Sequence, residues 1–155
     1  MFECIESGIE KYKEHGHIYV TGDFNARTAN LPDFLERDRF LDTNIELDYI
    51  NLPERVNKDH VIDAHGRRLV YLCKTTNLFI GNGRLDEDKH LGSFTFYNNN
   101  GASTVDYLLI QFNNLKHITS FKIKPPNEFS GHCPICFCIN RKPAQLISRD
   151  DAPTH

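Results

Sequence analysis

The stretch that most constrains the fold is residues 17–25, where an apolar and aromatic run ends in Gly22-Asp23-Phe24-Asn25. Such a run predicts a buried strand that delivers its last side chains to the edge of a sheet. On an extended segment Asp23 and Asn25 point to the same face. A carboxylate can deprotonate a water and a carboxamide can donate to an oxyanion, but Gly-Asp-Phe-Asn is also a common turn composition.

A helix is expected just before this strand. Over residues 2–15, apolar side chains recur every three or four positions, at Phe2, Ile5, Ile9 and Tyr12. This period predicts an amphipathic helix, with Gly16 as its C-cap. A helix followed at once by a strand with a polar end is typical of α/β proteins, in which sites gather beyond strand ends.

The rest of the chain predicts one more clear helix and several strands. Residues 66–74 have helical spacing and are followed by Asn77, a suitable stop. Strands are predicted from β-branched and aromatic content at 78–83, 93–97, 104–110, 118–123 and 135–139. We therefore expect an α/β fold with a mixed, largely antiparallel sheet, one domain over residues 1–140, and a polar tail over residues 141–155.

Residues 27–59 are polar and charged and predict a long surface excursion. Four of its acidic residues suggest a metal site at first sight: Asp38, Asp42, Glu46 and Asp48. Spread through a charged loop, they are better interpreted as a solvated face.

Charge and composition limit the choice of partners. The net charge of −3 divides into −6 for residues 1–50 and +3 for residues 51–155, so neither part is polybasic, and a nucleic-acid surface would be local. No apolar run reaches membrane-spanning length, and the first residues do not form a signal peptide. Five cysteines without a regular spacing suit reduced thiols, so we expect an intracellular protein with no structural disulfide and no membrane partner.

Three of those cysteines lie close to His132 and raise the question of zinc. Cys133 and Cys136 have a two-residue ligand spacing, and Cys138 follows. On a strand, however, Cys136 and Cys138 share one face and Cys133 the other. Small apolar cysteines packed in a core explain the cluster better than zinc does.

Three motifs occur in an informative order along the chain: Gly22-Asp23-Phe24-Asn25, then Ser103-Thr104-Val105-Asp106-Tyr107, then Ser130-Gly131-His132-Cys133-Pro134-Ile135. In this order they resemble the endonuclease/exonuclease/phosphatase superfamily. The intervening text is similar to the branch found in non-LTR retrotransposon endonucleases, at Gly66-Arg67-Arg68-Leu69, Asn82-Gly83-Arg84 and Gly92-Ser93-Phe94-Thr95-Phe96.

The resemblance implies a metal-dependent phosphodiester hydrolase on a partial α/β sandwich of two sheets covered by helices. It implies that Asp23 orients or activates the attacking water and that Asn25 contacts the scissile phosphate. It also implies that His132 stabilises the transition state or the leaving group, with Asp106 orienting its imidazole. Mg²⁺ or Mn²⁺ is the implied cofactor, with Asp23, Asn25 and His132 as its expected contacts, and DNA is the implied partner.

The sequence departs from the family pattern in two respects. The family has Ser-Asp-His where this chain has Ser130-Gly131-His132, so a carboxylate is missing. The resemblance covers about residues 2–140 and corresponds to the C-terminal part of the family domain, so the metal-binding glutamate of the N-terminal part is expected to lie outside these residues. We therefore expect weak or no turnover, and we expect Gly131→Asp to restore a ligand.

Half a sandwich would also leave an apolar sheet face uncovered, chiefly over residues 105–110 and 135–139. This predicts self-association or docking onto an N-terminal segment. Three classes of function stay open: an active nuclease or phosphatase, an inactive nucleic-acid-binding or structural remnant of a retroelement protein, and a fragment without a biochemical role.

Overall fold

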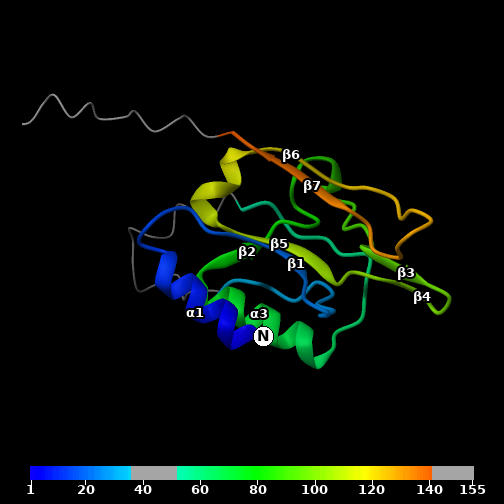
Figure 1. Cartoon of the computed structure of the whole chain (residues 1–155), viewed down its shortest axis with the longest axis horizontal. Helices are drawn as coiled ribbons and strands as arrows, with labels where there is room; N and C mark the ends of the chain where they lie inside the picture. Colours follow the sequence, from blue (N-terminus) through cyan, green and yellow to red (C-terminus); the bar gives the residue numbers. More distant parts are fainter. Residues whose placement is uncertain (36–51, 141–155) are drawn as a thin grey trace, which may run out of the picture.

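The computed structural model describes residues 1–35 and 52–140 (Figure 1). The predicted acidic cluster of Asp38, Asp42, Glu46 and Asp48 and the predicted tail lie outside the described residues. The elements, with η for 3₁₀ helices, follow in this order: α1 (Phe2–Tyr12), β1 (Tyr19–Asp23), α3 (Ala64–Thr76), β2 (Leu78–Ile80), η1 (Asp86–Asp88), β3 (Phe96–Asn98), β4 (Gly101–Ser103), β5 (Asp106–Gln111), η2 (Phe112–His117), β6 (Ile118–Ile123) and β7 (Ile135–Ile139).

The central sheet has the strand order β1-β5-β2, and both pairings in it are antiparallel. Two antiparallel hairpins accompany it, β3–β4 and β6–β7. The expected α/β fold with largely antiparallel sheets is confirmed. The strand predicted at 93–97 is displaced, because the hairpin pairs Phe96–Asn98 with Gly101–Ser103 around the expected Asn-rich turn.

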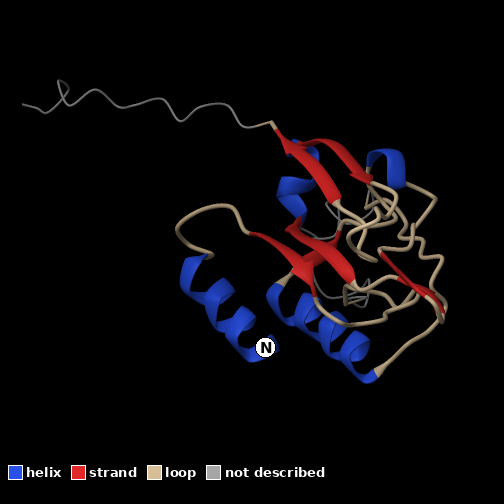
Figure 2. Ribbon diagram, turned by 45° about the vertical axis from the view of Figure 1, so that its right-hand side comes forward, coloured by secondary structure: helices blue, strands red, loops and turns tan. Residues whose placement is uncertain are grey.

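The two faces of β5 are buried against different layers of the same chain (Figure 2). Tyr107 and Leu109 pack with α1 and α3, whereas Leu108 packs with Phe121 and the β6–β7 hairpin. Successive strand residues point to opposite faces, so one strand can serve both layers. The expected uncovered face on β5 is therefore wrong, and it no longer supports self-association.

The helix ends follow from their capping groups. The Asp63 carboxylate accepts a 2.6 Å hydrogen bond from the Gly66 N–H at the start of α3, as an N-cap does. Asn77 ends α3 in the left-handed region, as predicted. Gly16 is not the C-cap of α1, because that helix ends at Tyr12 and Lys13 takes the cap position, its N–H donating to the Ile9 carbonyl. Among the described helices, none has the length and apolar character needed to cross a membrane.

Where the structure describes it, the predicted surface excursion over residues 27–59 has no named helix or strand, but it is only partly solvent-exposed. Its buried polar side chains are Thr28, Asp33, Arg55, Asn57 and Asp59. Asp33 forms a buried ion pair with Arg84 at 2.7 Å, and Asp59 pairs with Arg27 at 2.7 Å. Charged groups can be buried when each one has a partner, and that pairing cannot be recognised from a polar composition.

Candidate functional site

Strand register places two carboxylates opposite each other. Asp23 is the last residue of β1 and Asp106 the first of β5, and they are paired positions in the antiparallel ladder. Like charges directly across a ladder repel, so this pair favours a positive or hydrogen-bonding group nearby. The buried Phe24 continues the register, with its N–H donating to the Val105 carbonyl at 2.9 Å.

His132 is brought to these carboxylates by β3. It forms an isolated bridge with Phe96, and the two rings pack with centroids 4.6 Å apart. Its Nδ1 lies 3.0 and 3.1 Å from the carboxylate oxygens of Asp106. The partner that an aspartate in an apolar strand requires is therefore His132, as predicted.

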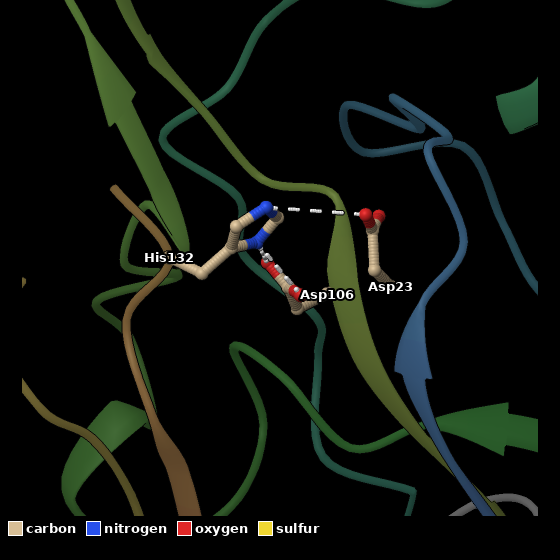
Figure 3. A group of neighbouring side chains, drawn as sticks. All are labelled: Asp23, Asp106 and His132. Atoms are coloured by element: carbon tan, nitrogen blue, oxygen red, sulfur yellow. Dashed lines mark hydrogen bonds and ion pairs between the residues drawn. The ribbon is translucent and has the colours of Figure 1, made fainter. Parts of the chain in front are cut away.

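The other imidazole nitrogen faces Asp23 (Figure 3). Nε2 of His132 is 4.0 Å from Oδ2 of Asp23, while Oδ1 of Asp23 accepts a 2.7 Å hydrogen bond from the Asn25 N–H. One ligand atom from each of Asp23, Asp106 and His132 lies within 4.8 Å of the others. Three of the four predicted site residues thus converge on one exposed point at the end of the sheet.

Asn25 does not continue the strand. Its φ of 47° is in the left-handed region, so the segment from Asp23 turns instead of remaining extended as predicted. The Asp23 carboxylate closes that turn through its bond to the Asn25 N–H, which is typical turn chemistry of aspartate. The carbonyl of Asn25 accepts a 3.0 Å hydrogen bond from Nδ1 of His65. The phosphate contact expected of the exposed Asn25 side chain stays a prediction.

Thr95 is a supporting residue that the sequence analysis did not identify. Its buried hydroxyl accepts 2.9 Å hydrogen bonds from the N–H groups of Val105 and Asp106. Its carbonyl accepts a 2.7 Å bond from the Cys133 N–H. Thr95 therefore joins the strand that carries Asp106 to the segment that carries His132. The only sequence signal was a threonine between two phenylalanines in the Gly92–Phe96 motif.

Tyr107 of the second motif joins that motif to the first. Its buried hydroxyl lies 2.9 Å from the Ala26 carbonyl and 2.7 Å from the Thr104 carbonyl. Burial raises the pKa of Tyr107 to about 12, so the hydroxyl stays protonated near neutral pH. The Tyr107 hydroxyl thus connects the turn that follows Asp23 to the strand that begins at Asp106.

The cysteines do not form a metal group with one another. Burial, followed by the charge of Asp106, raises the pKa of the Cys133 thiol, which disfavours the thiolate that a zinc ligand or nucleophile requires. Cys136 is half-buried and Cys138 is exposed. Over the part of the chain that the structure describes, the candidate metal group consists of Asp23, Asp106 and His132.

The donor set of that group fits a small divalent cation. Carboxylate oxygens suit Mg²⁺ and Mn²⁺, and an imidazole nitrogen is better tolerated by Mn²⁺. The 4.0 Å between Asp23 Oδ2 and His132 Nε2 is close to twice a ligand distance of about 2.1 Å. Asp106 stands in this group where the sequence analysis had expected Asn25.

The fold is thus α/β with mostly antiparallel sheets, and an acidic and imidazole cluster lies at one end of its central sheet. A solved structure similar to this chain is the endonuclease domain of TRAS1, a telomere-specific non-LTR retrotransposon, with a TM-score of 0.55 and 17% identity. The match covers 91% of this chain and 52% of that one, so this chain spans about half the length of its structural neighbour. No protein-family model and no curated protein matches the sequence.

Proposed function

We propose that this chain carries part of a metal-dependent phosphodiester hydrolase site of the endonuclease/exonuclease/phosphatase superfamily. The observation that carries the proposal is that His132 lies between Asp106 and Asp23, so that each of its imidazole nitrogens faces a carboxylate. The shared fold with a retrotransposon endonuclease domain supports it. DNA is the proposed substrate class.

Each residue has a role that its position permits. Asp106 holds the His132 ring through Nδ1, which fixes the orientation of Nε2 toward the open side of the site. Asp23 Oδ2 accepts a proton from the attacking water while the new P–O bond forms. His132 donates a hydrogen bond to a phosphate oxygen, which stabilises the charge that develops before the ester P–O bond breaks, and the departing ester oxygen takes its proton from water. Asn25 contacts the phosphate from the adjoining turn.

Asp23 is the residue that would hold Mg²⁺ or Mn²⁺, with Asn25 beside it. His132 could join as a ligand only through Nε2, and only when that nitrogen does not donate to the phosphate, because Nδ1 is bound to Asp106. When bound, the cation neutralises phosphate charge and lowers the barrier to attack. The carboxylate oxygen of Asp23 that does not bind the Asn25 N–H is the one that faces His132, so it is free to serve either as base or as ligand.

Turnover by this chain alone is expected to be weak, and Gly131 is the reason within the described residues. A Cβ built at Gly131 would lie 2.2 Å from the Tyr97 carbonyl oxygen, so the backbone leaves no room for the aspartate that the family has there. This observation favours a second candidate function, in which the site binds nucleic acid without cleaving it.

A plasmid-nicking assay with and without Mn²⁺ tests the proposal, using Asp23→Ala and His132→Ala as the decisive variants. Slow metal-dependent nicking that both substitutions abolish supports the hydrolase. The matched control is His15→Ala, an exposed histidine after α1, which should leave nicking unchanged. Nucleic-acid binding without nicking would favour the second candidate, and neither binding nor nicking would contradict both.

A further inference from the structure

A shallow groove of about 390 Å³ opens beside the candidate site. It lies between β3 and the loop that leads into His132, and Ser130 and Gly131 form part of its wall. The Ser130 hydroxyl accepts a 3.1 Å hydrogen bond from the His132 N–H, so the groove and the site share one short segment. The groove therefore adjoins the segment that carries His132.

Phe129 stands in this groove with 87% of its surface exposed. Its position is held by the loop, because the Asn127 side-chain oxygen accepts hydrogen bonds from the N–H groups of Phe129 at 2.9 Å and Ser130 at 3.1 Å. Asn127 and Ser130 also form a bridge. A hydrogen-bonded turn thus presents an exposed phenylalanine ring to solvent next to a polar site. Such a ring is suited to stacking against a planar group of a ligand.

The lining of the groove indicates what that partner is. Tyr97, 43% exposed, supplies a second aromatic ring, and the polar side chains of the wall are two amides, one hydroxyl and one carboxylate: Asn98, Asn127, Ser130 and Glu128. The lining contains no lysine or arginine, so a phosphate has no counter-charge there and Glu128 repels it. A neutral ring with hydrogen-bonding edges matches this chemistry, and nucleobases stack on such exposed aromatic residues.

We propose that Phe129 and Tyr97 form a stacking platform for an unpaired nucleobase, next to the phosphate bound at Asp23 and His132. The inference rests on the proposed function and narrows it, since the substrate becomes a nucleic acid with an unstacked base beside the phosphate. A base inside an intact duplex, or a small phosphoester, cannot use the platform.

The test measures binding separately from cleavage. The full chain, in Ca²⁺ without Mg²⁺ or Mn²⁺, is titrated into a short single-stranded oligodeoxynucleotide carrying one 2-aminopurine. A second strand of the same length and charge, with every base replaced by an abasic sugar, reports the backbone contribution. Phe129→Ala should weaken binding of the base-bearing strand roughly tenfold, as loss of one stacking contact does, and leave the abasic strand unchanged. Phe129→Trp should retain the wild-type affinity.

The matched control is Tyr71→Ala, which removes an aromatic side chain, 67% exposed, from α3 and should leave both affinities unchanged. Equal binding of the two strands by the wild type, absence of binding, or an unaltered affinity of Phe129→Ala would each overturn the platform. Loss of self-association in Phe129→Ala without an effect on the oligonucleotide would instead assign Phe129 to a protein contact. If Phe129→Ala weakened binding of the base-bearing strand but the wild-type chain did not nick DNA, the stacking platform would be supported and the proposed hydrolase activity would be contradicted.

Discussion

Asp106 and His132 form a hydrogen-bonded pair across two motifs, with Nδ1 of the imidazole 3.0 and 3.1 Å from the two carboxylate oxygens. The Asp106 side chain is 14% exposed and that of His132 is 42% exposed. The carboxylate is therefore the fixed member of the pair, and the imidazole is the member that can meet a ligand.

The first prediction concerns this pair. Asp106→Ala should lower any metal-dependent nicking by roughly a hundredfold or more, because an oriented acid or base contributes about 10² to 10⁴ in rate. Unfolding stability should change little, since His132 can hydrogen-bond to water once its partner is gone. Nicking rates and urea denaturation of the same preparation measure the two effects. Unaltered nicking by Asp106→Ala would show that the pair has no role in the reaction.

Gly131 is the subject of the second prediction, and here the structure reverses the sequence-based expectation. Gly131→Asp should not raise activity, because its Cβ would lie 2.2 Å from the Tyr97 carbonyl, which belongs to the strand that holds His132. Even Gly131→Ala should destabilise the protein, by about 1–3 kcal/mol as overpacking does.

Gly8→Ala is the control for that substitution, since a Cβ at this position in α1 meets nothing within 4 Å. It should stabilise the protein by roughly 0.5–1 kcal/mol through helix propensity. Thermal melts of Gly131→Ala, Gly131→Asp and Gly8→Ala make the comparison. A melting temperature at or above the wild type for Gly131→Asp, together with faster nicking, would restore the original expectation.

The motif order was enough to predict that Asp23, Asp106 and His132 lie together. Asp23 ends β1 opposite Asp106, which begins β5, and His132 forms a bridge with Phe96 of β3. Periodicity likewise located α1, α3, β2, β6 and β7. Asn25 could not be placed in this way, since Asp23 closes a turn through its own side chain and hydrogen-bonding of that kind competes with the extended state.

The burial of polar side chains within residues 27–35 and 52–59 was also beyond sequence reasoning. Asp33 is buried because Arg84 reaches it from 51 positions away in the chain. A charged stretch looks solvent-exposed unless each partner is known, and partners this distant carry no local pattern. Thr95 was missed for a related reason, since its importance comes from the two segments that its hydroxyl and carbonyl join.

The third prediction concerns Tyr107. Tyr107→Phe removes the hydroxyl that lies against the carbonyls of Ala26 and Thr104, leaving buried acceptors without that donor. This should cost about 1–3 kcal/mol of unfolding free energy. Those carbonyls flank the Asp23 turn and Asp106. The nicking rate should therefore fall by a larger factor than the fraction of folded protein does. Urea denaturation with nicking under fully native conditions separates the two effects, and Tyr97→Phe, a change at an exposed phenol, is the control for stability. If Tyr107→Phe were as stable as the wild type, the Tyr107 hydroxyl would not hold these two segments together.

The last prediction is a pH dependence of stability that originates at Asp33. Burial favours the neutral form of this carboxyl, but two hydrogen bonds from Arg84, a third from the Ile80 N–H and the charge of Arg55 outweigh it, so the pKa of Asp33 is lowered. A carboxyl with a lowered folded-state pKa stabilises the protein above its ordinary value of 3.8, and this contribution is lost as the pH falls through the folded-state pKa. Asp59 acts in the same direction, because its burial is likewise outweighed by the hydrogen bonds from Arg27, and its pKa is lowered.

Asp33→Asn should therefore destabilise the protein by roughly 3–5 kcal/mol at neutral pH, because it leaves the Arg84 guanidinium buried without a counter-charge. Between neutral pH and about pH 3 its stability should fall less steeply than that of the wild type, with the remaining slope due to Asp59 and other carboxyls. Urea denaturation at several pH values gives both quantities. Glu10→Gln, which breaks the exposed pair with Lys13, should produce no measurable change. If the unfolding free energies of the wild type and Asp33→Asn fell equally with decreasing pH, the buried Asp33–Arg84 pair would not be a cause of the loss of stability in acid.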